Sequence, residues 1–264
     1  MVEPERLARE LNAFDCVVCL RDDPVMRAIM DQITAFRCLV SGTDEVHETS
    51  SHKQAVAAIA GDYARTELFS KLPIYWPSEV ASVGLCVAAG FPTNRWPNLR
   101  WLELADRLAE SGIGIVLVGG PGERDDLRLL SRFLAALPHR VLEGGNDFGE
   151  FLDALEGVDL VVASDGGTAH ICSLRKPVCS IFGSSPWRRY APFGWDNVVL
   201  TREEPCSPCT QFSTEQVNGC LTRECMAAIS ATQVAAAVRS NGIDFSSMRG
   251  LRVERGVSHR FATT

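Results

Sequence analysis

The segment 164–170, SDGGTAH, has the clearest chemical pattern in the chain, because it directly follows an apolar run typical of a buried strand. Two successive glycines let a backbone approach a ligand closely, and the N–H groups at the start of the helix that follows suit a phosphate or diphosphate. The carboxylate of Asp165 could hold a sugar hydroxyl, and His170 could reach the same edge. The alternative is a tight turn in which Asp165 caps the helix and His170 is a core residue.

Two further loops with chemically useful side chains also follow apolar runs. In residues 119–123, GGPGE, the Glu123 carboxylate could take both hydroxyls of a ribose, as acidic residues do in dinucleotide-binding folds. The alternative for this loop is a solvated turn. In residues 93–97, TNRWP, Arg95 could neutralise a phosphate, while Trp96 could cover a base or pack in the core.

The fourth loop, residues 183–194 (GSSPWRRYAPFG), supplies hydroxyl and guanidinium groups. Ser184 is the candidate for a ligand contact, with Ser185 beside it, and Arg188 and Arg189 add positive charge. A loop of this length after a strand is more often a binding loop than filler. The alternative is a surface excursion whose aromatic side chains pack back on the domain.

Four cysteines form a C-x2-C-x10-C-x4-C array, and they are Cys206, Cys209, Cys220 and Cys225. Four thiolates can make a closed tetrahedral site for a structural Zn or Fe, so these residues are candidate metal ligands. Free thiols or two disulfides are the alternatives. The other six cysteines are expected to be small buried apolar residues: Cys16, Cys19, Cys38, Cys86, Cys172 and Cys179.

These loops need a scaffold, and the middle of the chain predicts one in which strands and helices alternate. We expect strands over 82–88, 113–118, 140–142, 159–164, 177–182 and 197–201, and helices over 98–111, 125–137, 148–155 and 168–174. Gly112 is expected to end the first of these helices. Such alternation favours a parallel sheet covered on both faces, which binds ligands at the carboxyl ends of its strands. The four loops are therefore predicted to meet at one edge.

The length of 264 residues suits one large or two small domains. Residues 78–239 are predicted to form a Rossmann-like α/β domain, 1–77 a partial N-terminal α/β domain, and 240–264 an irregular tail. Within the N-terminal part we expect a strand over 14–20, helices over 24–36 and 52–69, and a linker over 73–77.

Composition and charge exclude several classes of protein. With 46% hydrophobic and 22% charged residues the chain is not disordered. Its net charge of −7 argues against nucleic acid as a partner, since phosphate contacts need a basic surface. The apolar runs 83–91 and 113–120 are too short to span a bilayer, and the charged start MVEPERLARE is no secretory signal. We therefore expect a cytoplasmic protein with reduced thiols.

Taken in order, three stretches resemble glycosyltransferase family 9, the heptosyltransferases of lipopolysaccharide core synthesis: AAGFPTNRWPNLRWLELADRL, IVLVGGPGE and LVVASDGGTAHICSLRKPVCSIFGSSP. The resemblance covers residues 80–235 and, more weakly, 5–45, and many members also have the CSPC segment followed by a helix. It implies an α/β, GT-B-like fold of two Rossmann-type domains, here with a shortened N-terminal domain. One departure is Asn94, which stands where the family usually has Lys, two residues before Trp96.

The resemblance also implies a function. That function is an inverting transfer of a heptose-like sugar from an ADP-linked or similar nucleotide diphosphate sugar to a glycan or lipid-linked acceptor, at the inner membrane face. No cofactor is expected for the chemistry. By this resemblance Glu123 would hold the ribose, Asp165 the sugar, and the backbone of Gly166, Gly167 and Thr168 the diphosphate.

The family's N-terminal domain begins with a strand and a Gly-Asp loop whose acidic residue is associated with the general base, and this sequence is expected to start after that point. Loss of a base removes a factor of about 10²–10⁴ in rate. Asp22 and Asp23, after the predicted strand 14–20, are weak candidates to replace it. The alternative function is nucleotide-sugar binding without catalysis, by a chain that needs a partner for the missing base. A third hypothesis, from the cysteines, is a metal-stabilised interaction module.

Overall fold

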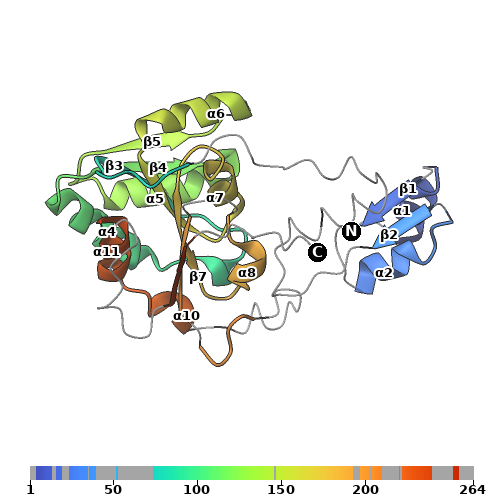
Figure 1. Cartoon of the computed structure of the whole chain (residues 1–264). Helices are drawn as coiled ribbons and strands as arrows, with labels where there is room; N and C mark the ends of the chain where they lie inside the picture. The colour runs from blue at the N-terminus through green and yellow to red at the C-terminus, as the bar shows by residue number, and fades with distance from the viewer. Residues whose placement is uncertain are drawn as a thin grey trace. The chain divides into compact units, whose positions relative to one another are not determined.

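The computed structural model shows two compact units, Met1–Ser70 and Lys71–Thr264 (Figure 1). The residues that it describes are 4–13, 16–19, 24–34, 36–39, 52, 74–145, 147–192, 197–202, 204–209, 220, 222–239 and 252–255. The three-part domain division drawn from the sequence stays a prediction. Among the described helices, none has the length and apolar character that a membrane crossing requires.

The N-terminal unit contains a pair of parallel strands and two helices. Their bounds are α1 (Pro4–Leu11), β1 (Cys16–Cys19), α2 (Pro24–Met30) and β2 (Phe36–Leu39), and β1 pairs with β2. A small apolar cluster holds these elements together: Ala8, Val17, Cys19, Ile29, Met30 and Ile33. The strand predicted over 14–20 is confirmed as β1.

The helix predicted over 24–36 is wrong beyond Met30, where the chain turns towards β2. The Asn12 side chain holds this turn, because its Oδ1 accepts a hydrogen bond from Thr34 N–H (2.7 Å) and its Nδ2 donates to Gln32 O (3.2 Å). Asn12, which is 20 residues from Gln32 and 22 from Thr34, thus stabilises the turn that ends the helix, and local periodicity does not reveal it. The helix predicted over 52–69 lies, apart from His52, outside the described residues.

The C-terminal unit is built on a seven-stranded sheet with the order β5-β4-β3-β6-β7-β8-β9. The strands are β3 (Ser82–Cys86), β4 (Gly114–Gly119), β5 (His139–Glu143), β6 (Leu160–Ser164), β7 (Val178–Phe182), β8 (Val198–Thr201) and β9 (Arg252–Arg255). The first six are parallel, in the strand order of a Rossmann fold. The predicted α/β class with a Rossmann-type sheet is therefore confirmed.

Strand β9 lies in the segment predicted as an irregular tail, so that prediction is wrong for Arg252–Arg255. These residues pair antiparallel to β8 and cover its backbone N–H and C=O groups, which would otherwise form an open sheet edge. The sequence RVER has a single apolar residue, so the hydrophobic pattern does not reveal a strand.

Helices cover both faces of the sheet, as predicted. Along β4, Ile115 and Leu117 join one apolar cluster, whereas Val116 and Val118 join another. The first cluster includes residues of α4 (Asn98–Glu110), α5 (Arg124–Phe133) and α11 (Ala231–Arg239), and Figure 1 shows α4 beside α11. The second includes residues of α6 (Phe148–Ala154) and α7 (Gly167–Cys172).

Two further predictions concern this unit: that Gly112 ends a helix and that residues 73–77 form a linker. Gly112 follows α4 with φ of 72°, in the left-handed region that favours glycine, as expected for a helix C-terminus. Residues 74–80 form no helix or strand, yet Trp76 is buried in the first apolar cluster. The last residues of the predicted linker are therefore anchored on the C-terminal unit.

Candidate functional site

The candidate site lies at the switch point of the sheet, where β3 and β6 are neighbours and the strand order proceeds in opposite directions from them. In open α/β sheets, ligands bind in the crevice at the carboxyl ends of the strands at this point. The loop after β3 contains the 3-10 turn η2 (Pro92–Asn94), and β6 is followed by Asp165 and α7. Asn94 Nδ2 donates to Asp165 Oδ2 (2.8 Å), which joins the two loops.

The same asparagine joins a third loop, the one after β7. Its Oδ1 accepts hydrogen bonds from the hydroxyls of Ser184 and of Ser185, the latter at 3.1 Å. All three side chains are buried. Loops from three neighbouring strands therefore meet at one side chain, as the predicted convergence of the loops requires.

The Asp165 carboxyl group is mostly enclosed by these loops. Burial raises its pKa from 3.8 to about 6, while the hydrogen bond from Ser185 acts in the opposite direction. In the described part of the chain, Asp165 takes part in none of the ion pairs. Its partners among the described residues are the Asn94 amide and the Ser185 hydroxyl, whose single O–H donates either to Asp165 or to Asn94 Oδ1 at one time.

The loop after β4 joins the same edge through Glu123, the last residue of η3 (Pro121–Glu123). Its Oε2 accepts hydrogen bonds from Gly120 N–H (2.8 Å) and from Thr168 Oγ1 (2.7 Å). Glu123 and Thr168 are 45 residues apart in the chain, and both were predicted to contact one ligand. The structure brings them into direct contact.

The two glycines after Asp165 have different surroundings. A Cβ at Gly166 would lie 3.1 Å from Ala88 O and 3.4 Å from Ala89 Cα, so the loops after β3 and β6 can pack this closely only around glycine. A Cβ at Gly167 would meet nothing within 4 Å. The first residue of α7 therefore faces open space, where a ligand can approach the backbone.

Arg95 provides the cation at this edge. Its Nε donates to Ala89 O (3.1 Å), and its Nη1 forms an ion pair with Asp126 of α5 (2.9 Å). The side chain is 41% exposed, which leaves part of the guanidinium accessible to an anionic ligand.

The other predicted residues have varied positions. His170 is exposed on α7, whereas the Ser184 hydroxyl is buried against Asn94. Trp96 packs in the core: its Nε1 donates to Ile229 O (2.9 Å), and its ring makes an edge contact with Trp101 at 4.9 Å. Arg188 and Arg189 lie over the rings of their neighbours Trp187 and Tyr190 in α8 (Trp187–Tyr190). Asp22 and Asp23 lie outside the described residues.

Asn94 is the residue of this edge that sequence reasoning missed, because it was treated only as a departure from a family pattern. The available signal was its place between Thr93 and Arg95, in a loop that follows a strand. A neutral amide offers no charge pattern, so its importance follows only from its partners.

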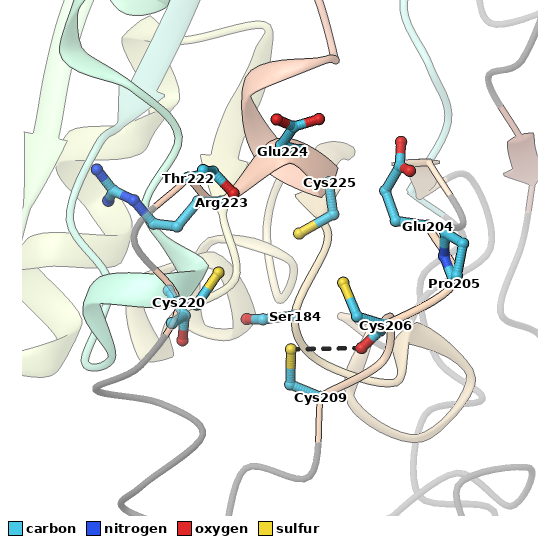
Figure 2. Close-up of a pocket in the computed structure, with 11 residues that line it drawn as sticks. Ser184, Glu204, Pro205, Cys206, Cys209, Cys220, Thr222, Arg223, Glu224 and Cys225 are labelled. Atoms are coloured by element: carbon cyan, nitrogen blue, oxygen red, sulfur yellow. Dashed lines mark hydrogen bonds between the residues drawn. The ribbon is translucent and has the colours of Figure 1, made fainter.

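The four cysteines of the array line one pocket of about 280 Å³, which we call the cysteine pocket (Figure 2). Its other lining residues include Thr93, Ser184 and Arg223. In the part of the chain that the structure describes, no three His, Cys, Asp or Glu side chains form a group that could hold a metal ion. The predicted Zn or Fe therefore stays a prediction.

The thiols of the cysteine pocket affect each other electrostatically. Burial raises the pKa of Cys225 to about 11, with a further contribution from Cys209 and Cys220. Burial and the neighbouring Cys206 and Cys220 also raise the pKa of Cys209. These two thiols are therefore protonated at neutral pH in the metal-free chain.

The segment that carries Cys206 and Cys209 is attached to the candidate site. Cys209 N–H donates to Ser184 O (2.8 Å), and Ser207 Oγ donates to Gly183 O. On the other side of the pocket, Arg223 Nη1 donates to Pro92 O (2.9 Å). The cysteine pocket thus lies against two of the loops that Asn94 connects.

Comparison with known proteins gives one family. Residues 25–219 match the model of "Glycosyltransferase family 9 (heptosyltransferase)". Lipopolysaccharide heptosyltransferase 1 of Pseudomonas aeruginosa is 33% identical over 122 residues, which are 44% of this chain and 33% of that protein. Lipopolysaccharide heptosyltransferase 2 of Escherichia coli is 28% identical over 116 residues, 41% of this chain and 32% of that protein. The matched stretch thus spans about a third of the length of these curated relatives.

Solved structures with the same fold include three bacterial transferases. The E. coli ADP-heptose lps heptosyltransferase II has a TM-score of 0.56 at 17% identity, covering 90% of this chain and 80% of that one. The E. coli heptosyltransferase WaaC with ADP-2-deoxy-2-fluoro heptose has a TM-score of 0.54 at 18% identity, covering 90% and 76%. The iron-containing dodecameric glycosyltransferase TibC of enterotoxigenic E. coli has a TM-score of 0.50 at 14% identity, covering 82% and 63%.

Proposed function

Because this chain belongs to glycosyltransferase family 9, we propose that it binds an ADP-activated heptose or a similar nucleotide sugar at the switch point of its C-terminal sheet and transfers the sugar to a glycan or lipopolysaccharide-core-type acceptor. Glu123 holds the ribose, the backbone at Gly166, Gly167 and Thr168 holds the diphosphate, and Asp165 holds the sugar. Support for the donor comes from the solved relatives, which are described with ADP and with an ADP-heptose analogue.

The observation that carries this proposal is the direct contact between Glu123 and Thr168. It puts the acidic group that suits a ribose next to the start of α7, beside the open space at Gly167. A ribose and a diphosphate are adjacent parts of one nucleotide, so their binding groups must be adjacent too. Arg95 supplies positive charge at the same edge, which suits a diphosphate leaving group.

In this proposal the transfer inverts the configuration at the anomeric carbon of the sugar. The acceptor oxygen forms a bond to the anomeric carbon as the bond to the diphosphate oxygen breaks, ADP leaves, and a base takes the acceptor proton. Asp22 and Asp23 remain the candidates for that base. The acceptor is membrane-linked and the reaction occurs on the cytoplasmic side, where nucleotide sugars are available.

Nucleotide binding is the first test. Thermal unfolding is measured with ADP, UDP, GDP and CMP and with their sugars. A ligand at 100 times its Kd adds about 2.7 kcal/mol of stability, which raises Tm by roughly 5–10 °C for a chain of this size. We expect ADP and ADP-heptose to give the shift. The Glu123→Ala variant loses it, whereas Glu110→Ala, at the exposed end of α4, keeps it. A flat panel contradicts the proposal.

Turnover separates the two functions that share this binding site. Release of ADP from ADP-heptose in the presence of a lipopolysaccharide-core acceptor, with transfer of the sugar detected by mass spectrometry, establishes the transferase. Binding without transfer under the same conditions supports the alternative, a nucleotide-sugar-binding protein that needs a partner for the base.

We further propose that the four cysteines of the cysteine pocket hold a structural Zn or Fe when metal is present. Support comes from the pocket that all four cysteines line and from the electrostatic effect of neighbouring thiols on the pKa of Cys209 and Cys225, which reflects their proximity. Metal binding must displace thiol protons, so its affinity falls as pH falls. In the described structure the four thiols do not form a ligand set. Metal binding must therefore bring Cys206 and Cys209 closer to Cys220 and Cys225.

Elemental analysis of the purified chain tests this metal site. One Zn or Fe per chain is expected, and it is lost in Cys209→Ser and in Cys225→Ser. Cys179→Ala is the matched control, since Cys179 is buried in β7 away from the pocket. Absence of metal contradicts the proposed metal site, and a thiol titration then shows whether the cysteines are free or oxidised.

A further inference from the structure

Asn94 occupies an unusual position for a neutral side chain. It is 5% exposed, and it hydrogen bonds to the loops that follow β6, which is next to β3 in the sheet, and β7, which is next to β6. Its own loop follows β3. A single carboxamide therefore determines how three loops of the candidate site meet.

The polarity of the carboxamide suits both of its contacts. An ionised carboxylate only accepts hydrogen bonds, so Asp165 needs the Nδ2 donor, while the hydroxyls of Ser184 and Ser185 donate to Oδ1. The opposite amide orientation would place Oδ1 against a carboxylate oxygen. A lysine at this position would donate to Asp165 but would offer no acceptor to the two hydroxyls.

We propose that Asn94 is a positioning residue for the donor sugar: it holds the Asp165 carboxyl group in place without giving it a cationic partner, so that the contact of this carboxyl group with the sugar depends on its proton state. This inference rests on the proposed function, because the donor sugar is what Asp165 contacts there.

Among the described residues, no cation forms an ion pair with Asp165. Arg95, in the loop after β3, is paired with Asp126, and Glu123 is hydrogen bonded to Thr168. The charged or titratable side chains on α7 and α8 are His170, Cys172, Arg188, Arg189 and Tyr190. Since burial raises the pKa of Asp165 to about 6, the group is charged at pH 7.5 and mostly neutral at pH 5.

Protonation removes a charged acceptor from the sugar. A hydrogen bond to a charged group is stronger than one to a neutral group, so the affinity for the donor is expected to fall as pH falls through about 6. The expected loss is about tenfold between pH 7.5 and pH 5. The diphosphate of a nucleotide sugar is esterified at both ends and does not titrate in this range, unlike the terminal phosphate of free ADP.

The test is calorimetric titration of the full chain with ADP-heptose, without acceptor, from pH 5 to pH 8. Wild type is compared with Asn94→Asp, Asn94→Lys and Ser185→Ala. A second carboxylate beside Asp165 raises the pH midpoint of binding, and a lysine lowers it until the loss disappears from this range. Ser185→Ala removes the hydrogen bond that favours the charged form, so it also raises the midpoint.

Opposite shifts from two substitutions at one position cannot come from loss of structure alone. Thermal unfolding and near-UV circular dichroism identify variants that do not fold. If Asn94→Lys is among them, the nearly isosteric Asn94→Asp and the exchange at Ser185 still provide the shift. Carboxyl-carbon NMR of aspartate-labelled protein reads the titration of Asp165 without ligand.

Three results have clear meanings. A pH midpoint near 6 that moves in the stated directions supports the inference. Tight binding of ADP-heptose with the same pH dependence in wild type and in all folded variants overturns it and leaves the proposed function intact. Failure of both ADP and ADP-heptose to bind at pH 7.5 overturns the proposed function, and this inference with it.

Discussion

The acidic side chains at the carboxyl edge of the sheet differ in their partners and surroundings. Asp126 forms an ion pair with the guanidinium of Arg95. Glu123 accepts from a backbone N–H and from the Thr168 hydroxyl. Asp165 is the one that burial shifts clearly towards its neutral form. The raised pKa of Asp165 therefore makes its charge depend on pH near neutrality.

The first prediction concerns how Asp165 affects stability. Its pKa is about 6 in the folded chain and 3.8 as a free side chain, so between these values the folded state binds a proton that the unfolded state lacks. Stability due to this group is therefore fully present below about pH 4 and is lost as pH rises to 6. We expect Asp165→Asn to gain about 3 kcal/mol relative to wild type between pH 4 and pH 7.5.

Urea unfolding of the two proteins at several pH values measures this difference, and subtraction cancels the other titrating groups. A difference that is constant with pH, or that shrinks towards pH 7.5, contradicts a raised pKa at Asp165.

The second prediction uses the two adjacent glycines as a matched pair. Gly166→Ala places a Cβ at 3.1 Å from Ala88 O, and overpacking of this kind costs about 1–3 kcal/mol. Gly167→Ala adds its methyl group in open space at the first residue of α7, where alanine restricts the unfolded chain and adds about 0.4–1 kcal/mol. Urea midpoints of the two variants should move in opposite directions; equal losses would show that the loops after β3 and β6 are not packed as described.

The loops of the site contact each other, and the loop that carries Asn94 also contacts the C-terminal part of the chain. Trp96, after η2, donates to Ile229 O just before α11, and Arg223 donates to Pro92 O. The C-terminal segment around α10 (Glu224–Ala227) and α11 therefore supports the loop that carries Asn94. Elements separated by more than a hundred residues cooperate in placing one short turn.

The third prediction tests this support with two neighbouring tryptophans. Both are at most 1% exposed, but the Trp96 N–H has a carbonyl partner whereas, among the described residues, the Trp101 N–H has none. Trp96→Phe leaves the buried Ile229 carbonyl without this donor, which costs about 1–3 kcal/mol beyond the loss of volume. Trp101→Phe loses volume only.

Chemical denaturation gives the two free energies of unfolding directly. If Trp101→Phe is as destabilising as Trp96→Phe, the hydrogen bond to Ile229 contributes nothing, and the support of the loop from α11 has to be abandoned.

At the scale of the whole molecule, all residues assigned to the donor belong to the unit Lys71–Thr264, whereas Asp22 and Asp23 belong to Met1–Ser70. A fourth prediction follows from this separation. A fragment of residues 71–264 should bind ADP-heptose as tightly as the full chain, because every donor contact remains, and should not transfer the sugar. Calorimetry and an ADP-release assay on the fragment and the full chain check both parts. A folded fragment that binds no nucleotide would show that the N-terminal unit completes the donor site.

Local sequence patterns are sufficient to predict the Rossmann-type unit and the loops that carry its candidate site. The strands β3, β4, β6, β7 and β8 follow from apolar runs, and strands that alternate with helices favour a parallel sheet with its loops at one edge. Asp165 and Glu123 are candidates because of their residue type and their places after strands, and Thr168 is a candidate because of the family resemblance. These are local properties, so local patterns are sufficient to find them.

Which side chains act together depends on contacts between segments that are distant in the sequence. Asn94 and Asp165 are 71 residues apart, and their hydrogen bond depends on β3 and β6 becoming neighbours in register. The burial of Trp96, the end of α2 and the pairing of β9 likewise depend on partners that lie far away along the chain. A neutral amide carries no charge or periodicity of its own, so its role at the site is set entirely by the groups that folding places around it.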